Sequence, residues 1–593
     1  MYTLAFSLLI LFTQTNPLVR GIDTVAHANA DVPTLKLPWG TYEGYPFEDD
    51  DNIYLFSNVR FGAKPELFSA PEFPPWTDSS VQPPSDGRSC IQIDPSQLDK
   101  PPGGENPIND PADSYPDTSE DCLFLDLYVP KSVIDNDTPV PVVVWIYGGA
   151  FAFGSKNQLG PLYTGQSILS ASKYQTIFVA GNYRLGAYGW LAGSYMQTAG
   201  QTNAGLYDQA LLFEWVQLYI GQVNGDKDQV SAFGESAGAS SILHHVIREG
   251  GTVDPLFDRF AVQSPAFEWA WDNSPNGKLD KVYKNFSDFA GCGQNFDIDC
   301  LRSSKNLSEA NQELFNSVRQ TGLFPVGPAV DDVWIKTIPT LSFANDEFWK
   351  GISSAIISHT LNEPASFTPK GITTETAFND FLAIFLPGAK LESQRERIAQ
   401  QYNCTQLFDG DYTLCIATVI RDASFTCNTR DLYSVYPSKS YMMRYGYPIP
   451  EYAYHASDLI PLFANSFDEA VDLLSKSLGR GLAYAYARPL IKTNLAVAYQ
   501  TYFASFAAFG DPNGLSLPLV ADKQPPKWPA ADGSDDELAN VLTVQIPSGQ
   551  EGFVLASDDQ NGKERCRFWT TLAKGIMEAQ GSNQDDGASY GEL

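Results

Sequence analysis

The amino-acid sequence predicts an α/β protein with a mostly parallel central sheet, helices on both faces, and large loop and helical insertions. Two observations support this fold class. Short apolar runs rich in β-branched residues end at glycine or proline and alternate with segments of helical periodicity. One such run leads directly into the turn GESAG at 234–238 and then into a helical pattern. Alternating strands and helices are typical of a parallel sheet covered on both sides.

The elements can be placed in order along the chain. Residues 40–120 are rich in proline, aspartate, glycine and aromatic residues, which predicts loops and short strands. Buried strands are expected from three apolar runs bounded by turn residues. These runs are CLFLDLYVP from 122, PVPVVVWIYGG from 139 and YQTIFVAGNYRLG from 174.

A helix over 210–220, a strand at QVSAF (229–233) and a helix through Ile242 and Ile247 follow. Residues 381–499 are expected to be mostly helical. No segment has the composition of a linker, so residues 30–580 are expected to form one domain.

The N-terminus and the cysteines indicate a secreted protein. Residues 1–20 resemble a signal peptide, whose cleavage site the sequence leaves open, because the apolar run over 4–12 is too short to span a bilayer. An even number of cysteines, eight, none of them in a CxxC motif, favours disulfides over metal or redox sites. Four glycosylation sequons fit the same extracellular location: Asn136, Asn285, Asn306 and Asn403.

The charge balance limits the partners. A net charge of −31 argues against nucleic acid and anionic membranes. No second segment is long and apolar enough for a membrane anchor, and no cofactor or metal is expected. A small-molecule substrate is the expected partner, and the oligomeric state is not readable from the sequence.

Ser236 is the candidate nucleophile. In GESAG it stands between two glycines, which leave room for a sharp strand-to-helix turn that exposes its hydroxyl. A serine hydroxyl needs a base and a site that stabilises negative charge on oxygen. The Gly-Gly-Ala turn at 148–150, directly after a strand, can supply backbone N–H groups for that second task.

The base has to be one of five histidines. His27 is too near the N-terminus, and His244 and His245 fall on the helix after Ser236, where a structural role is expected. His359 and His455 remain. The chain order nucleophile, acid, histidine favours Glu363 with His455, whereas His359 as base leaves the acid unassigned.

The sequence resembles the type-B carboxylesterase family of α/β-hydrolases, which also includes cholinesterases, secreted fungal lipases and the adhesion proteins called neuroligins. The resemblance lies in five stretches and thins in the second half of the chain. They are SEDCLFLDLYVP (119–130), VVWIYGGAF (143–151), NYRLGAYGWL (182–191), NAGLYDQALLFEWV (203–216) and FGESAGAS (233–240).

The resemblance implies roles for individual residues. Ser236 would be the nucleophile, His455 the base and Glu363 the acid of a triad. Oxyanion N–H groups would come from Gly149, Ala150 and Ala237, and supporting carboxylates would be Glu235 and Asp458. The implied disulfides are Cys90–Cys122, Cys292–Cys300 and Cys427–Cys566, which leaves Cys404 to pair with Cys415.

The sequence departs from the family pattern at four positions. Ala150 stands where many members have glycine, and Pro364 follows Glu363 where a glycine is usual. Asn224 and Pro265 also replace usual residues, and both are expected near the working edge of the sheet. None of these changes removes a catalytic group.

The function that follows is a secreted serine carboxylesterase that acts on small-to-medium esters through an acyl-enzyme. Its base has to be neutral, so the rate is expected to fall on the acid side with an apparent pKa of about 6 to 7.

The rival functions are an interfacial lipase and, from another class, a non-catalytic binding glycoprotein. The segment between Cys90 and Cys122 is acidic and proline-rich, which argues against the lipase. The presence of Ser236, Glu363 and His455 together argues against the binding protein. The same segment has no tryptophan, which disfavours a cholinesterase.

Overall fold

The computed structural model describes residues 32–83, 87–94, 118–136, 138–157, 163–318, 324–545 and 552–581. The proposed signal peptide, His27 and most of the segment between Cys90 and Cys122 lie outside the described residues.

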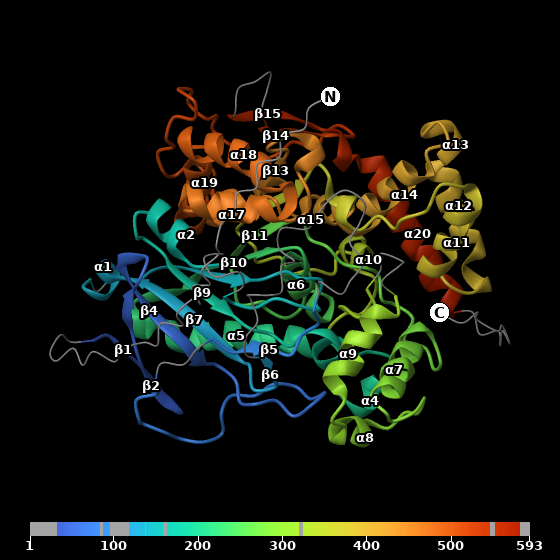
Figure 1. Ribbon diagram of the computed structural model, residues 1–593, viewed down its shortest axis with the longest axis horizontal. Helices are drawn as coiled ribbons and strands as arrows, with labels where there is room; N and C mark the ends of the chain where they lie inside the picture. The colour runs from blue at the N-terminus through green and yellow to red at the C-terminus, as the bar shows by residue number, and fades with distance from the viewer. Residues whose placement is uncertain are drawn as a thin grey trace, which may run out of the picture.

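The structure is organised round an 11-stranded sheet that runs across the molecule (Figure 1). Its order is β15-β14-β13-β12-β11-β10-β8-β9-β7-β4-β3. The strands from β14 through β9 in this order pair in parallel, and the strands at both ends pair antiparallel. A mostly parallel central sheet was predicted, and the prediction is confirmed.

The bounds of its strands are β3 (Tyr45–Phe47), β4 (Asp50–Arg60), β7 (Phe124–Pro130), β8 (Val140–Ile146), β9 (Ile177–Gly181), β10 (Gly225–Glu235), β11 (Arg259–Gln263), β12 (Ser354–Thr360), β13 (Ser440–Tyr445), β14 (Leu538–Gln545) and β15 (Gly552–Asp558). Two-stranded sheets form from β1 (Thr34–Leu37) with β2 (Gly40–Glu43), and from β5 (Ser89–Cys90) with β6 (Thr118–Ser119).

Helices cover the sheet and form the insertions. The first half contains α1 (Lys131–Ile134), α2 (Gln166–Ala171), α3 (Gly186–Trp190), α4 (Met196–Ala199), α5 (Ala204–Tyr219), α6 (Ala237–Val246), α7 (Lys278–Phe289), α8 (Ile298–Ser303) and α9 (Leu307–Asn316). The second half contains α10 (Pro339–Ala344), α11 (Glu375–Phe385), α12 (Glu392–Tyr402), α13 (Cys404–Leu407), α14 (Tyr412–Arg421), α15 (Cys427–Val435), α16 (Leu459–Phe463), α17 (Phe467–Leu478), α18 (Arg480–Lys492), α19 (Leu495–Phe509) and α20 (Lys563–Gly581).

Two helical insertions lie on the right of Figure 1. The lower one contains α7, α8 and α9, and the upper one contains α11 to α14 with α20. The predicted strands after 122, 139 and 174, the helix after 210 and the strand–turn–helix at Ser236 all form near the expected places.

One local prediction is wrong. Only short strands were expected over residues 40–120, but β4 has 11 residues, Asp50–Arg60. Its first half pairs with β3, and its pairing with β7 continues across a register shift between Phe56 and Val59. Polar and aromatic residues are tolerated in this strand because only part of it is buried.

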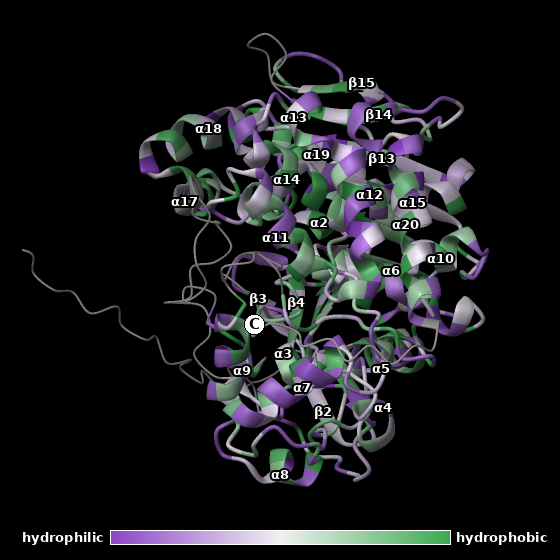
Figure 2. Cartoon of the chain, turned by 90° about the vertical axis from the view of Figure 1, so that its right-hand side faces the viewer, coloured by the Kyte–Doolittle hydropathy of each residue, from purple (hydrophilic) through white to green (hydrophobic). Residues whose placement is uncertain are grey.

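Buried apolar side chains fill the interior. Figure 2 shows hydrophobic and hydrophilic residues alternating along the outer helices. The strands β7, β8 and β9 are buried along most of their length, as expected for strands covered on both faces. Among the described residues, no helix has both the length and the apolarity to cross a bilayer.

Parallel strands place their carboxyl ends at one edge of the sheet. Here β8 ends at Ile146, β10 at Glu235, β11 at Gln263 and β12 at Thr360. Ligands of open α/β sheets bind outside such carboxyl ends. This edge is therefore where the candidate site is built.

Candidate active site

Ser236 occupies the sharp turn between β10 and α6. Its φ is 56° and its ψ is −123°, a strained conformation for a residue with a side chain. The turn is held because the Ser236 N–H donates to the Gln263 carbonyl over 2.9 Å. The residue stands at the carboxyl edge of the sheet and is 7% exposed.

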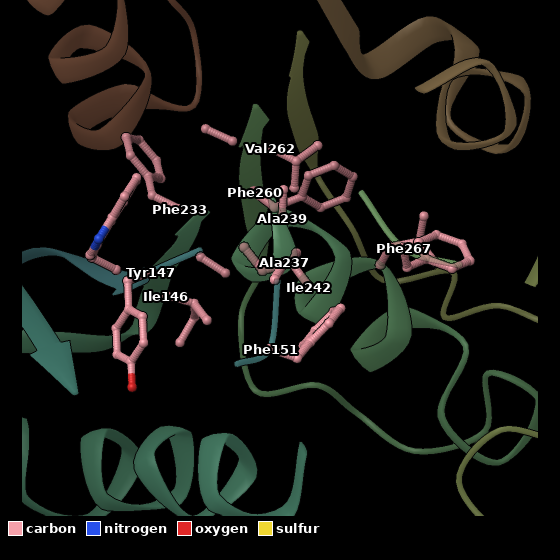
Figure 3. Packing of buried hydrophobic residues seen from close by; sticks show 14 of the residues in the cluster. Ile146, Tyr147, Phe151, Phe233, Ala237, Ala239, Ile242, Phe260, Val262 and Phe267 are labelled. Carbon is pink, nitrogen blue, oxygen red and sulfur yellow. The ribbon is translucent and has the colours of Figure 1, made fainter. Parts of the chain in front are cut away.

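The glycines of the turn are required by close approaches. A Cβ at Gly238 would lie 2.0 Å from the Ile146 carbonyl oxygen, and a Cβ at Gly234 would lie 2.8 Å from the Gly238 carbonyl carbon. Figure 3 shows Ile146, Ala237 and Phe151 among the buried apolar residues around this turn. The GESAG pattern is thus a packing requirement as well as a motif.

His455 contacts the serine directly. Its Nε2 lies 2.7 Å from the Ser236 Oγ, and its Nδ1 lies 2.6 Å from the Glu363 Oε2. The imidazole is buried, and the rings of Phe367 and Phe425 stand edge-on to it with centroids 5.2 and 5.0 Å away. A neutral imidazole that donates from Nδ1 can accept the serine proton at Nε2.

Glu363 is fixed on its other side. Its Oε1 accepts hydrogen bonds from the Ser264 hydroxyl over 2.5 Å and from the Thr360 N–H over 2.6 Å. Burial opposes ionisation of this carboxyl, but His455 and these two donors outweigh burial and hold its pKa below the ordinary value. Glu363 is therefore an anion that orients the imidazole.

Two further carboxyl groups lie close to the imidazole. Glu235 Oε1 is 3.3 Å from His455 Nε2, and Asp458 Oδ2 accepts a hydrogen bond from Gln263 over 2.8 Å. Burial raises the pKa of Glu235 to about 8 and that of Asp458 to about 6.

The pKa of His455 differs from the ordinary histidine value on which the sequence-based expectation rests. Burial lowers its pKa, but the negative charges of Glu235 and Glu363 outweigh burial and raise the pKa well above 6.5. The sequence predicts an apparent pKa of about 6 to 7, whereas the charges around His455 favour a higher value.

The loop after β8 lies beside the serine. Gly149, Ala150 and Phe151 have positive φ values of 107°, 54° and 60°. No described residue accepts a hydrogen bond from the N–H groups of Gly149, Ala150 or Ala237. Ala150 tolerates its methyl group at the cost of a left-handed backbone, about 1 kcal/mol.

A cavity opens beside Ser236. It holds about 1110 Å³ of space not filled by atoms, its open mouth included. Most of its lining side chains are apolar, among them Phe151, Phe324, Phe381 and Phe385. An apolar wall of this kind suits the hydrocarbon part of a small molecule.

The other described histidines lie apart from Ser236. His244 contacts the Ser240 carbonyl, and His245 contacts Gln209, both within the buried interior. His359 is fully buried and its Nε2 lies 2.7 Å from Asp558 Oδ2. The structure thus brings His455, and not His359, to the serine.

The remaining departures from the family pattern have structural explanations. Pro364 follows Glu363 inside a short 3₁₀ helix, where its fixed φ is compatible with the backbone. Pro265 lies just beyond β11, at the working edge. Asn224 does not: it precedes β10 at the opposite end of the strand, where its side chain donates to Val133 and Asn136.

Four disulfides join the described cysteines. They are Cys90–Cys122, Cys292–Cys300, Cys404–Cys415 and Cys427–Cys566, the pairs stated above. Of the sequon residues, Asn136 and Asn306 are exposed, whereas Asn285 and Asn403 are partly buried.

Several site residues were not anticipated from the sequence. Ser264 supports Glu363, Gln263 supports Asp458, and Glu268 and Lys278 line the cavity. The available signal was position: Gln263 and Ser264 end or follow a parallel strand, where site residues gather. Glu268 and Lys278 lie in a loop and at a helix start, which carry no such signal.

Comparisons with known proteins identify the family of this chain. The model of the carboxylesterase family matches residues 31–569. A secreted lipase of Arthroderma benhamiae is 34% identical over 473 residues, 78% of this chain and 84% of that protein. The carboxylesterase patB of Aspergillus clavatus is 26% identical, covering 91% of this chain and 96% of that protein.

Solved structures show the same fold. The crystal structure of EstA from Aspergillus niger superposes with a TM-score of 0.70 at 22% identity, covering 92% of this chain and 99% of that one. A thermophilic pNB esterase superposes with a TM-score of 0.69 at 21% identity, covering 90% and 99% of the two chains.

Proposed function

Because the chain belongs to the carboxylesterase family, we propose that it is a secreted enzyme that hydrolyses small-to-medium carboxylic esters through an acyl-enzyme on Ser236. The observation that carries the proposal is the hydrogen-bonded chain from Ser236 through His455 to Glu363. It provides a nucleophile, a base and an anion that orients the base.

In the first step, the Ser236 oxygen attacks the ester carbonyl while its proton moves to His455 Nε2. The tetrahedral intermediate carries a negative oxygen, which accepts hydrogen bonds from the N–H groups of Gly149, Ala150 and Ala237 in this proposal. His455 then gives the proton to the leaving alcohol, and the acyl group remains on Ser236.

Water completes the reaction. His455 takes a proton from water, the hydroxide attacks the acyl carbonyl, and Ser236 leaves as the proton returns to it. Glu363 stays ionised throughout and stabilises the imidazolium that forms twice per turnover. Asp458, and Glu235 once it is ionised, add negative potential around the same ring.

The location and the single-domain organisation are part of the proposal. Four disulfides and two exposed sequon asparagines support an oxidising, extracellular location. One continuous cluster of buried side chains extends from Leu35 to Ile576, which supports a single domain over residues 30–580.

Two other functions were considered. A non-catalytic binding glycoprotein has no need of the serine–histidine–glutamate chain. An interfacial lipase is favoured by one observation, the apolar cavity, and by the name of the Arthroderma benhamiae relative. A test that separates lipase from esterase is given in the Discussion.

The proposal is tested by replacing the nucleophile. With p-nitrophenyl butanoate as substrate, Ser236→Ala is expected to lower kcat by about 10³–10⁶-fold, because the members of a triad act as a unit. Ser240→Ala is a matched control, since Ser240 lies on α6 and its hydroxyl donates to the Ala266 carbonyl. Activity retained in Ser236→Ala would contradict the proposal.

A further inference from the structure

Two ionisable side chains line the same cavity as Ser236. Glu268 lies in the loop after β11, and Lys278 is the first residue of α7. The cavity is otherwise mostly apolar, formed by phenylalanine, tryptophan, valine, leucine and alanine side chains. Charged groups are uncommon in an apolar wall, because burying them costs free energy unless they are paired.

These two groups do not pair with each other. No ion pair within 4.0 Å involves either of them among the described residues. Glu268 Oε1 accepts one hydrogen bond, from the Phe324 N–H over 2.9 Å. The Lys278 ammonium lies 5.8 Å from the centre of the Trp271 ring and donates no hydrogen bond to a described residue.

The two groups nevertheless influence one another. Burial raises the pKa of Glu268 to about 7, and the Lys278 charge opposes that shift. Burial lowers the pKa of Lys278, and the Glu268 charge opposes that shift as well. They are close enough to interact through space and too far apart to satisfy each other's hydrogen bonds.

A bound group can supply the missing hydrogen bonds. A bound carboxylate would pair with the Lys278 ammonium but would be repelled by the Glu268 carboxylate. A bound ammonium would pair with Glu268 but would be repelled by Lys278. A hydroxyl suits both, because it can accept from the ammonium and donate to the carboxylate without changing the net charge of the wall. Hydrogen bonds to charged groups are the stronger kind.

Building on the proposed esterase function, we propose that the cavity selects esters that carry a hydroxyl group on the part of the molecule that fills it, with Lys278 and Glu268 binding that hydroxyl. The pair then determines specificity and takes no part in bond cleavage. The prediction is a preference for the hydroxylated ester over the ester of equal length that lacks the hydroxyl.

Kinetics with matched esters test the proposal. On the acyl side, p-nitrophenyl hexanoate is compared with p-nitrophenyl 6-hydroxyhexanoate and with mono-p-nitrophenyl adipate. On the alcohol side, butyl butanoate is compared with 4-hydroxybutyl butanoate in a pH-stat. The measured quantity is the ratio of kcat/KM for the hydroxylated ester to that for its parent.

The variants are Lys278→Met, which keeps the length of the side chain, and Glu268→Gln, which keeps an acceptor for the Phe324 N–H. For the wild-type enzyme, the ratio of kcat/KM for the hydroxylated ester to that for its parent is expected to exceed one on either the acyl side or the alcohol side. Lys278→Met is expected to lower that ratio about 10-fold, and Glu268→Gln to lower it less. Lys284→Met is the control: it removes the same charge from α7, but its Nζ binds Asn276 and it does not line the cavity.

Two results would overturn the inference. One is a ratio that Lys278→Met and Glu268→Gln leave unchanged on both sides. The other is a preference for the adipate ester that Glu268→Gln strengthens, which would make Lys278 a binding site for anions instead. Failure of the proposed function looks different: p-nitrophenyl hexanoate itself would then show no hydrolysis that depends on Ser236.

Discussion

At the scale of single residues, Glu235 sets the charge state of the base. Its Oε1 lies 3.3 Å from His455 Nε2, the atom that has to be unprotonated to accept the serine proton. A negative Glu235 favours the imidazolium and raises the pKa of His455. The enzyme should therefore lose activity as the pH falls through a midpoint above 6.5.

Glu235→Gln is expected to shift that midpoint down by about 1 pH unit, because it removes a negative charge next to the ring. The measurement is kcat/KM from pH 5 to 10 with a p-nitrophenyl ester, corrected for spontaneous hydrolysis. Asp254→Asn, an acidic residue remote from the ring and hydrogen-bonded to the Leu256 N–H, is the control. An unchanged midpoint would mean that Glu235 is already uncharged when His455 titrates.

The sequence was enough to name the candidate triad, but it did not reveal the residues that hydrogen-bond to the triad or line the cavity. Ser236 stands in a motif whose glycines the fold requires, and the loop at 148–150 follows a recognisable strand. Ser264 and Glu363 are 99 positions apart in the sequence. Glu268 and Lys278 are related only because both line the folded cavity. Local patterns cannot report contacts of this kind.

At the scale of elements, the strand β12 links a buried ion pair to the triad. His359, on β12, binds Asp558 at the end of β15, and the next residue, Thr360, donates its N–H to Glu363. Burial lowers the pKa of His359, but Asp558 outweighs burial and raises it. Burial likewise opposes ionisation of Asp558, yet His359 holds its pKa well below the ordinary value.

The pair therefore stabilises the fold within a definite pH window. The contribution of Asp558 is present above its ordinary pKa of 3.8 and is lost as the pH falls toward its lowered value. The contribution of His359 is present below its ordinary pKa of 6.5 and is lost as the pH rises through its raised value. Stabilisation is fullest between those two ordinary values.

Asp558→Asn is expected to destabilise the protein by about 3 kcal/mol near pH 5, since it removes one partner of a buried pair. Thermal unfolding followed by circular dichroism at pH 5 and pH 9 should show a larger loss at pH 5. Asp559→Asn, an exposed neighbour, is the control. Equal losses at the two pH values would contradict the ion-pair account. His359→Ala is a poor control for the His455 variant, because that change also breaks this pair.

The strands β7, β8, β9 and β10 and the helices α5 and α6 could be placed from the sequence, because strands buried on both faces have continuous apolar sequences and helices have their own periodicity. The parallel strands β11 and β14 were not predicted, and neither was the length of β4 at the antiparallel end of the sheet. The strands β3, β4 and β15 mix polar and apolar residues, since they are less fully covered, and their sequences resemble those of loops.

At the scale of the whole molecule, the net charge of −31 bears on the choice between esterase and lipase. An acidic surface gains little from an oil–water interface, since carboxylates resist transfer out of water. We therefore expect no jump in rate as a short-chain ester passes its solubility limit. Tributyrin titrated through that limit in a pH-stat is the measurement, with a known interfacial lipase in parallel. Sharp activation above the limit, or high activity on emulsified long-chain triglyceride, would favour the lipase.

The central claim is that one serine, Ser236, carries the acyl group, and covalent labelling tests it most directly. The full-length protein is treated with a fluorophosphonate probe and analysed by intact mass and peptide mapping. The account predicts one label per chain, located on Ser236, no label in Ser236→Ala, and greatly slowed labelling in His455→Ala. A label on another serine, or undiminished labelling of Ser236→Ala, would contradict it.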